Sequence, residues 1–158
     1  MSLKSLWIAA LLACSASFAQ AQEVMSFTEA KAAGYDFNEM GEKYLTAYTR
    51  GKLDTCAFPG MRDSLMQTYQ VMLDELTLYL NDKRFEWGKA NRGFFRLYFN
   101  EDAELEYFFY NLRGLEEKQE EKMKKLVEKF YEDYRFPMKA EMPFYIFGPA
   151  KLIDTAKK

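Results

Sequence analysis

Apolar residues recur at helical spacing in three stretches of the chain, over residues 36–50, 61–80 and 115–134. This spacing gathers apolar side chains on one face of a helix, so each stretch predicts an amphipathic helix. The stripe of the second helix consists of Met61, Leu65, Tyr69, Met72, Leu76 and Tyr79. The stripe of the third consists of Met123, Leu126, Val127, Phe130, Tyr131 and Tyr134.

Two other runs, residues 94–99 and 105–112, are rich in aromatic residues and are separated by the polar residues 100–104. Aromatic runs on either side of a short polar turn predict an antiparallel hairpin. A third such run, residues 144–147, lies between Pro143 and a Gly-Pro pair and predicts one further strand. The fold class expected is therefore α+β, with N-terminal helices followed by a β-β-α-β unit that forms a small three-stranded antiparallel sheet.

These elements divide the chain into a helical lead-in over residues 22–57, an α+β domain over 58–153 and a polar tail over 154–158. Within the lead-in, Ser26 and Glu29 have the spacing of a capping box, which predicts one or two helical turns.

Residues 1–21 have the form of a cleaved signal peptide. Lys4 precedes an uncharged apolar run, and Ala19-Gln20-Ala21 supplies small residues at the cleavage positions. We therefore expect a periplasmic or secreted protein without a membrane span after cleavage. Two alternatives remain open: a retained anchor, and a lipoprotein signal in which Cys14 is acylated.

The composition of the chain excludes some catalytic and metal sites and disfavours one class of partner. The chain has no His, which excludes a Ser-His-Asp triad and a His-ligated zinc within this chain. Loss of Lys4 with the signal takes the net charge from −2 to −3, which does not favour nucleic acid as a partner. Cys56 is then the single cysteine, to be interpreted as a buried inert thiol or as a reactive one. We expect neither a cofactor nor a metal site, and no enzymatic activity.

From Phe58 onward the chain resembles the C-terminal domain of the TonB energy-transducer family. Phe58-Pro59-Gly60-Met61 is similar to the motif that opens the first helix of that domain, and a hairpin, a helix and a final strand follow in the same order over residues 58–150. The resemblance implies a shared fold and the binding of partner peptides by strand addition. Met61 stands where the family has a second glycine, and the chain lacks the family's Pro-rich linker.

The aromatic strands supply the candidate binding residues. Alternation places Phe94, Arg96 and Tyr98 on one face of the first hairpin strand, and Glu106, Phe108 and Tyr110 on one face of the second. Exposed aromatics beside a charge can form a partner surface. The last strand offers an edge for strand addition. The alternatives are helices that cover both faces, and a last strand that lies within the sheet. The candidate partner-binding residues are Phe94, Arg96, Tyr98, Phe108, Tyr110, Phe144, Tyr145, Ile146 and Phe147.

Four acidic residues lie in or beside the hairpin turn: Glu101, Asp102, Glu104 and Glu106. They lack the glycine-punctuated spacing of a calcium loop. We interpret them as a solvated turn.

The sequence thus predicts an exported, non-catalytic cell-envelope module that binds a protein or peptide, with strand addition as one mode of binding. The alternative is a small-ligand-binding domain with an aromatic pocket. An enzyme that uses Cys56 or paired carboxylates is a third hypothesis.

Overall fold

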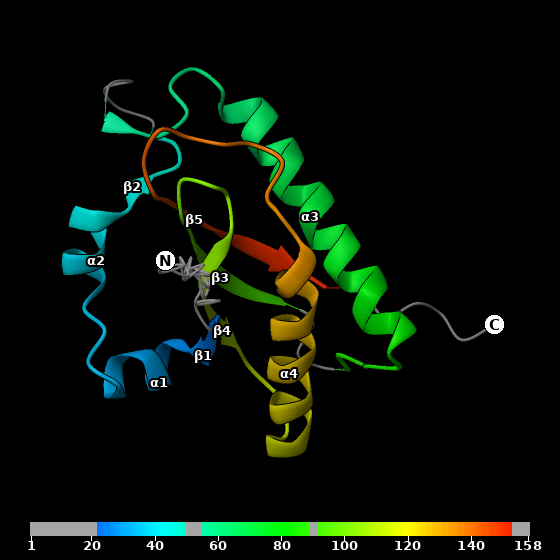
Figure 1. The fold of residues 1–158 in the computed structure, drawn as a ribbon. Helices are drawn as coiled ribbons and strands as arrows, with labels where there is room; N and C mark the ends of the chain where they lie inside the picture. Colours follow the sequence, from blue (N-terminus) through cyan, green and yellow to red (C-terminus); the bar gives the residue numbers. More distant parts are fainter. Residues whose placement is uncertain (1–21, 50–54, 89–91, 153–158) are drawn as a thin grey trace, which may run out of the picture.

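The computed structural model describes residues 22–49, 55–88 and 92–152. In these residues it has four helices and one five-stranded mixed sheet, which confirms the α+β class (Figure 1). The predicted signal peptide, its Cys14 and the polar tail lie outside the described residues.

The sheet is larger than predicted. Its strands are β1 (Glu23–Ser26), β2 (Leu45–Thr46), β3 (Arg92–Phe99), β4 (Leu105–Leu112) and β5 (Phe144–Lys151). They lie in the order β1-β4-β3-β5-β2. The pairs β3/β4 and β3/β5 are antiparallel, whereas β1/β4 and β2/β5 are parallel. The expected three-stranded antiparallel sheet is therefore corrected, because the N-terminal segment adds a strand to each side of it.

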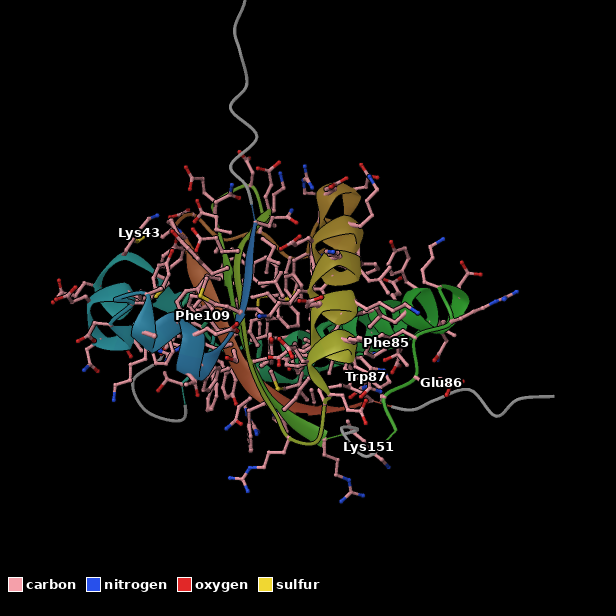
Figure 2. The ribbon with its side chains drawn as sticks, turned by 90° about the horizontal axis from the view of Figure 1, so that it is seen from below. Lys43, Phe85, Glu86, Trp87, Phe109 and Lys151 are labelled. Carbon is pink, nitrogen blue, oxygen red and sulfur yellow. The ribbon has the colours of Figure 1, made fainter. Side chains whose placement is uncertain are left out.

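The helices form a layer on each face of this sheet. Figures 1 and 2 show α3 (Arg62–Asp82) and α4 (Glu117–Asp133) on one face, and α1 (Phe27–Ala32) and α2 (Phe37–Lys43) on the other. In Figure 2, Phe109 lies on the side of α1 and α2, whereas Phe85 and Trp87 lie on the side of α3. Both faces of the sheet are therefore at least partly covered.

The predicted helix starts agree with the structure. Ser26 Oγ accepts from the Glu29 N–H at 3.2 Å, and the Glu29 carboxylate accepts from the Ser26 N–H at 2.8 Å, which completes the capping box of α1. Asp36 caps α2 by accepting from the Asn38 N–H at 2.7 Å.

The end of α2 was predicted wrongly. The helical pattern extends to about residue 50, but α2 ends at Lys43. Leu45 and Thr46 instead pair with Phe144 and Tyr145 of β5. Pairing with a distant strand outweighs the local helical preference of this short segment.

The main core lies between the sheet and the pair α3 and α4. Helix α3 contributes the buried residues Leu65, Tyr69, Met72, Leu73, Leu76 and Leu80, and α4 contributes Met123, Val127 and Tyr131. The sheet contributes alternate residues of its central strands: Phe95, Leu97, Phe99, Leu105, Phe108, Tyr110, Phe144 and Ile146. Alternate positions meet the helices because successive strand residues point to opposite faces.

A second, smaller core lies under α1 and α2. Ala30, Tyr44, Tyr98 and Phe109 are its buried members. Tyr98 is surrounded by aromatic rings, with centroids of Tyr44 at 4.9 Å, Tyr145 at 5.5 Å and Phe109 at 5.7 Å.

A β-bulge changes the predicted faces of β4. Tyr98 pairs with Tyr107, but Phe99 pairs with Leu105, which leaves Glu106 as an extra residue. Glu106 accordingly faces Tyr44, with which it shares a hydrogen bond, while Leu105 belongs to the main core. The prediction that placed Glu106 on one face with Phe108 and Tyr110 is therefore wrong at Glu106, and Leu105 takes its place on that face.

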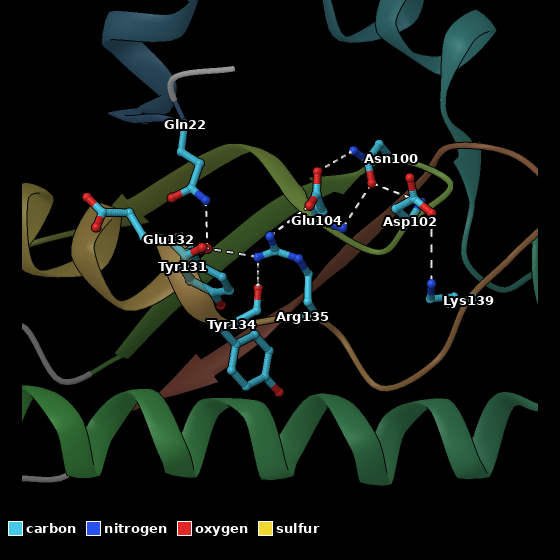
Figure 3. A network of polar contacts seen from close by, with 9 residues as sticks. All are labelled: Gln22, Asn100, Asp102, Glu104, Tyr131, Glu132, Tyr134, Arg135 and Lys139. Atoms are coloured by element: carbon cyan, nitrogen blue, oxygen red, sulfur yellow. Dashed lines mark hydrogen bonds and ion pairs between the residues drawn. The ribbon is translucent and has the colours of Figure 1, made fainter. Parts of the chain in front are cut away.

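The hairpin turn is tied to the end of α4 by polar contacts (Figure 3). Asn100 Oδ1 accepts from the Asp102 and Glu104 N–H groups at 3.0 and 2.9 Å. Arg135 forms an ion pair with Glu104 at 2.7 Å, and Lys139 lies 3.8 Å from Asp102. These two turn carboxylates each face a separate basic residue, which supports a structural role for the turn.

Strand β5 continues four residues beyond its predicted end at Phe147. A Cβ at Gly148 would lie 3.1 Å from the Tyr69 ring, so glycine here admits close packing of α3. Glycine and proline usually end a strand. Here Gly148 is accommodated because it packs tightly against Tyr69, and Pro149 because its backbone lies on the outer edge of β5.

Helix α3 ends with an unusual residue. The Phe85 N–H donates to the Leu80 carbonyl and the Arg84 N–H to the Asn81 carbonyl, both at 2.9 Å, which is a Schellman motif. Arg84 takes the left-handed position with φ of 55°, where glycine is unstrained.

We expect Arg84→Gly to raise the free energy of unfolding by about 0.5–1 kcal/mol, because glycine removes the left-handed strain. Urea denaturation would measure this, with the exposed Arg62→Gly at the start of α3 as a control that should destabilise the protein. An unchanged or lower stability of Arg84→Gly would contradict the prediction.

Candidate functional site

One end of the sheet face under α1 and α2 carries no helix. Helices α1 and α2 pack over Tyr98, Tyr107 and Phe109, but Phe94 and Phe147 farther along this face are 46% and 47% exposed. The register of β3, β4 and β5 places six residues together there, which we name the open surface: Arg92, Phe94, Arg96, Asn111, Phe147 and Lys151. It combines two exposed aromatic side chains with three cations.

The two aromatic side chains form a stacked pair. The ring centroids of Phe94 and Phe147 lie 5.7 Å apart with planes tilted by 22°. Phe27 of α1 borders the pair, at 6.5 Å from Phe147. An exposed aromatic pair on a flat strand surface is a typical feature of protein interfaces.

Arg96 lies at the border between the covered and the open parts of this face. Its guanidinium carbon is 4.5 Å from the ring centroid of Tyr145, 4.8 Å from Phe37, 5.6 Å from Tyr98 and 6.0 Å from Phe147. Arg96 Nε is buried and has no hydrogen-bond partner among the described residues. The aromatic faces therefore hold a half-buried cation that keeps unused donors.

Two clefts that open to solvent meet at Arg96. The larger, of about 840 Å³, lies between α1 and α2 and includes Phe27, Tyr35 and Phe37 in its lining. The smaller, of about 440 Å³, lies between β5 and the residues that follow β2, and its lining includes Tyr48, Tyr145 and Phe147. Arg96 is the residue common to both linings.

The charges of the open surface are not balanced within the described residues. No ion pair there includes Arg92, Arg96 or Lys151. Arg92 and Lys151 are direct cross-strand partners, so two like charges face each other. Arg113 joins them around a third cleft of about 530 Å³, whose lining holds three basic residues and no acidic one.

The outer edge of β5 is covered over only part of its length. Strand β2 pairs with Phe144 and Tyr145, and the Ala47 N–H donates to the Tyr145 carbonyl at 2.8 Å. Alternation then directs the backbone groups of Phe147, Pro149 and Lys151 outward. Proline has no N–H, so this edge offers a short and interrupted ladder.

Tyr98 beneath the Arg96 guanidinium stays protonated at neutral pH. Its burial raises the pKa of the hydroxyl to about 12, and the positive charge of Arg96 opposes that rise only in part. The site therefore presents a fixed cation beside neutral rings near pH 7.

The structure separates the nine predicted binding residues into two groups. Phe94 and Phe147 are exposed, and Arg96 and Tyr145 are half-buried, so these four are available at the open surface or its clefts. The other five are interior, and we withdraw them as partner contacts: Tyr98, Phe108, Tyr110, Phe144 and Ile146. Tyr98 lies under α1 and α2, and the remaining four face α3 and α4.

The sequence did not single out Arg92, Asn111 or Lys151. A signal was present for Arg92, because Arg92, Phe94 and Arg96 alternate along one strand. Lys151 was missed because β5 was predicted to end at Phe147.

The sequence offered two other candidates, the Cys56 thiol and the acidic residues in or beside the hairpin turn. Cys56 is a buried thiol. Glu106 faces Tyr44 and Lys43, away from the rest of the acidic turn. Among the described residues, no group of three or more acidic, His or Cys side chains is placed to hold a metal ion.

Comparisons with known proteins leave the chain without an assigned family. No protein-family description, curated protein or solved structure matches it. Among the described residues, no helix is both long enough and apolar enough to cross a membrane. The resemblance to the TonB C-terminal domain stays a prediction from the sequence.

Proposed function

We propose that this protein is an exported, non-catalytic module of the cell envelope that binds a protein or peptide segment on the open surface. The observation that carries the proposal is the exposed Phe94–Phe147 pair beside cations that have no ion-pair partner among the described residues. Desolvation of two exposed aromatic rings favours association, and polar groups around them favour specificity.

Strand addition would contribute less than side-chain contacts in this proposal. The outward edge of β5 beyond β2 offers the N–H and C=O of Phe147, but Pro149 interrupts the ladder. A partner strand would gain few backbone hydrogen bonds there. The aromatic pair and the cations are therefore expected to supply most of the binding energy.

Site-specific photocrosslinking in the native envelope would test the proposal. A crosslinking residue at position 94 should give a discrete adduct that Phe147→Ser weakens at least several-fold, because the mutation removes half of the aromatic pair. The same crosslinker at Leu78, which is 62% exposed on α3, serves as the matched control. Equal adducts from positions 94 and 78, or an adduct unaffected by Phe147→Ser, would reject the proposed surface.

A second candidate function, small-ligand binding, is favoured by the two clefts at Arg96. They are lined in part by Phe and Tyr, as predicted for an aromatic pocket, but they open to solvent. A ligand in either cleft would protect Tyr145 or Phe37 from solvent while leaving Phe94 exposed, a pattern that NMR shift mapping distinguishes from a partner on the whole open surface.

A further inference from the structure

We infer that the segment bound on the open surface is acidic, and that one of its carboxylates pairs with Arg96 between the aromatic rings. This inference rests on the proposed function and specifies the chemistry of the partner.

Arg96 is incompletely solvated. A guanidinium has five N–H donors in a planar fork, and a protein interior usually satisfies them with carboxylates or carbonyls. Here ring faces and the Tyr98 hydroxyl surround the guanidinium, and the buried Nε has no partner among the described residues. Rings offset part of the desolvation cost but accept few hydrogen bonds. A carboxylate that enters from a cleft would complete this shell.

Asp36 and Glu106, two acidic residues on the same side of the sheet as Arg96, are engaged elsewhere. Asp36 lines the larger cleft, but its carboxylate accepts from the Asn38 N–H at the start of α2. Glu106 accepts from the Tyr44 hydroxyl and lies 3.7 Å from Lys43 Nζ. Neither forms an ion pair with Arg96.

Arg92 and Lys151 form a pair of like charges on the open surface. Two cations directly opposite on neighbouring strands repel each other. The whole sequence carries a net charge of −2, so a surface with cations but no acidic residue is a local feature and not a reflection of overall composition. An anionic segment laid across β3 and β5 would relieve this repulsion and be steered to it.

The open surface also limits the other classes of partner. Single-stranded nucleic acid uses aromatic rings and cations too, so it is included below as a competing ligand. The outward N–H and C=O of Phe147 suit the backbone of a polypeptide. Because Phe94 lies between Arg96 and the Arg92–Lys151 pair, and its stacking partner Phe147 lies opposite Arg96, we expect an aromatic or aliphatic residue between the carboxylates of the segment.

The first experiment selects ligands from a phage-displayed library of random peptides on the folded protein. We expect enrichment of peptides with two or more Asp or Glu residues around an apolar one. Enriched peptides without acidic residues that still depend on Phe94 and Phe147 would overturn this inference and leave the proposed function standing. No enrichment dependent on these two residues would overturn both.

The second experiment compares an enriched peptide with its Gln and Asn counterpart, which has the same shape without the charges. The acidic form should bind at least tenfold more tightly, and its affinity should fall as salt is added. Arg96→Gln should remove most of this difference, Arg96→Lys should restore only part of it, and Lys125→Gln on α4 should change nothing. Equal affinity of the two peptides would overturn the inference even if Arg96→Gln failed to fold, because that comparison uses the wild-type protein. Tighter binding of an oligonucleotide or an anionic vesicle than of the acidic peptide would likewise overturn it.

Discussion

Phe99→Ala is expected to lower the free energy of unfolding by about 3–5 kcal/mol, the range for removing a fully buried aromatic side chain. Phe99 has no exposed surface and stacks against Phe144 at 5.2 Å and Phe136 at 5.1 Å. It joins the hairpin to β5 and to the segment after α4, so the cavity would lie where three parts of the main core meet. Urea denaturation would measure the loss.

Phe94→Ala is the matched control, because Phe94 lies on the same strand but faces the open surface and is 46% exposed. We expect it to cost less than about 1 kcal/mol. Similar losses for the two variants would contradict the placement of these residues on opposite faces of β3.

The second large effect is expected at alkaline pH. Five tyrosines are buried in the two cores, and their burial raises the pKa of each hydroxyl above its ordinary value: Tyr44, Tyr69, Tyr98, Tyr110 and Tyr131. In the unfolded chain a tyrosine ionises near pH 10. The stability that these groups contribute is therefore fully present below pH 10 and is lost as the pH rises above it toward the folded values.

Each such group lowers the free energy of unfolding by about 1.4 kcal/mol per pH unit above 10, so five together remove roughly 7 kcal/mol per unit. That slope is comparable to the total stability of a small domain. We expect cooperative unfolding between about pH 10 and 12, in which the tyrosinate absorbance rises together with the loss of circular dichroism. Gradual ionisation near pH 10 before any change in secondary structure would contradict this result.

Tyr131→Phe provides a control within this experiment. Its hydroxyl is buried and has no hydrogen-bond partner among the described residues, so its removal should keep or raise stability at pH 7 and shift the alkaline transition upward. Tyr110→Phe should instead lower stability at pH 7 by about 1 kcal/mol, because the Tyr110 hydroxyl donates to Glu120 at 2.5 Å.

The elements that the sequence predicted well are those whose signal is local and continuous. Helices α3 and α4 and the β3–β4 hairpin each extend over eight or more residues with one apolar period. Strands β1 and β2 have only four and two residues, too few for a period to appear. Their conformation is set by β4 and β5, which come much later in the chain.

The site was predicted in part for the same reason. The alternation of Phe94 and Arg96 was visible in the sequence, and Phe147 was a candidate as part of a sheet edge. The pairing of Arg92 with Lys151 depends on the register of two strands that α4 separates, which no local pattern contains. Tyr98 is buried because α1 and α2 cover the second face of the sheet. The sequence left this open, because both faces of the strands carry aromatic residues.

The origin of the two outer strands has a consequence for how the chain reaches its native state. Both β1 and β2 come from the first described segment, and both pair in parallel with strands from the second half of the chain. Contacts between such distant residues slow folding, because a long loop must close before they form. The emerging N-terminal segment cannot complete its sheet contacts until β5 has been synthesised. A chain with this order of pairing therefore completes its sheet only late in synthesis, after both of its outer strands have waited for strands from the second half.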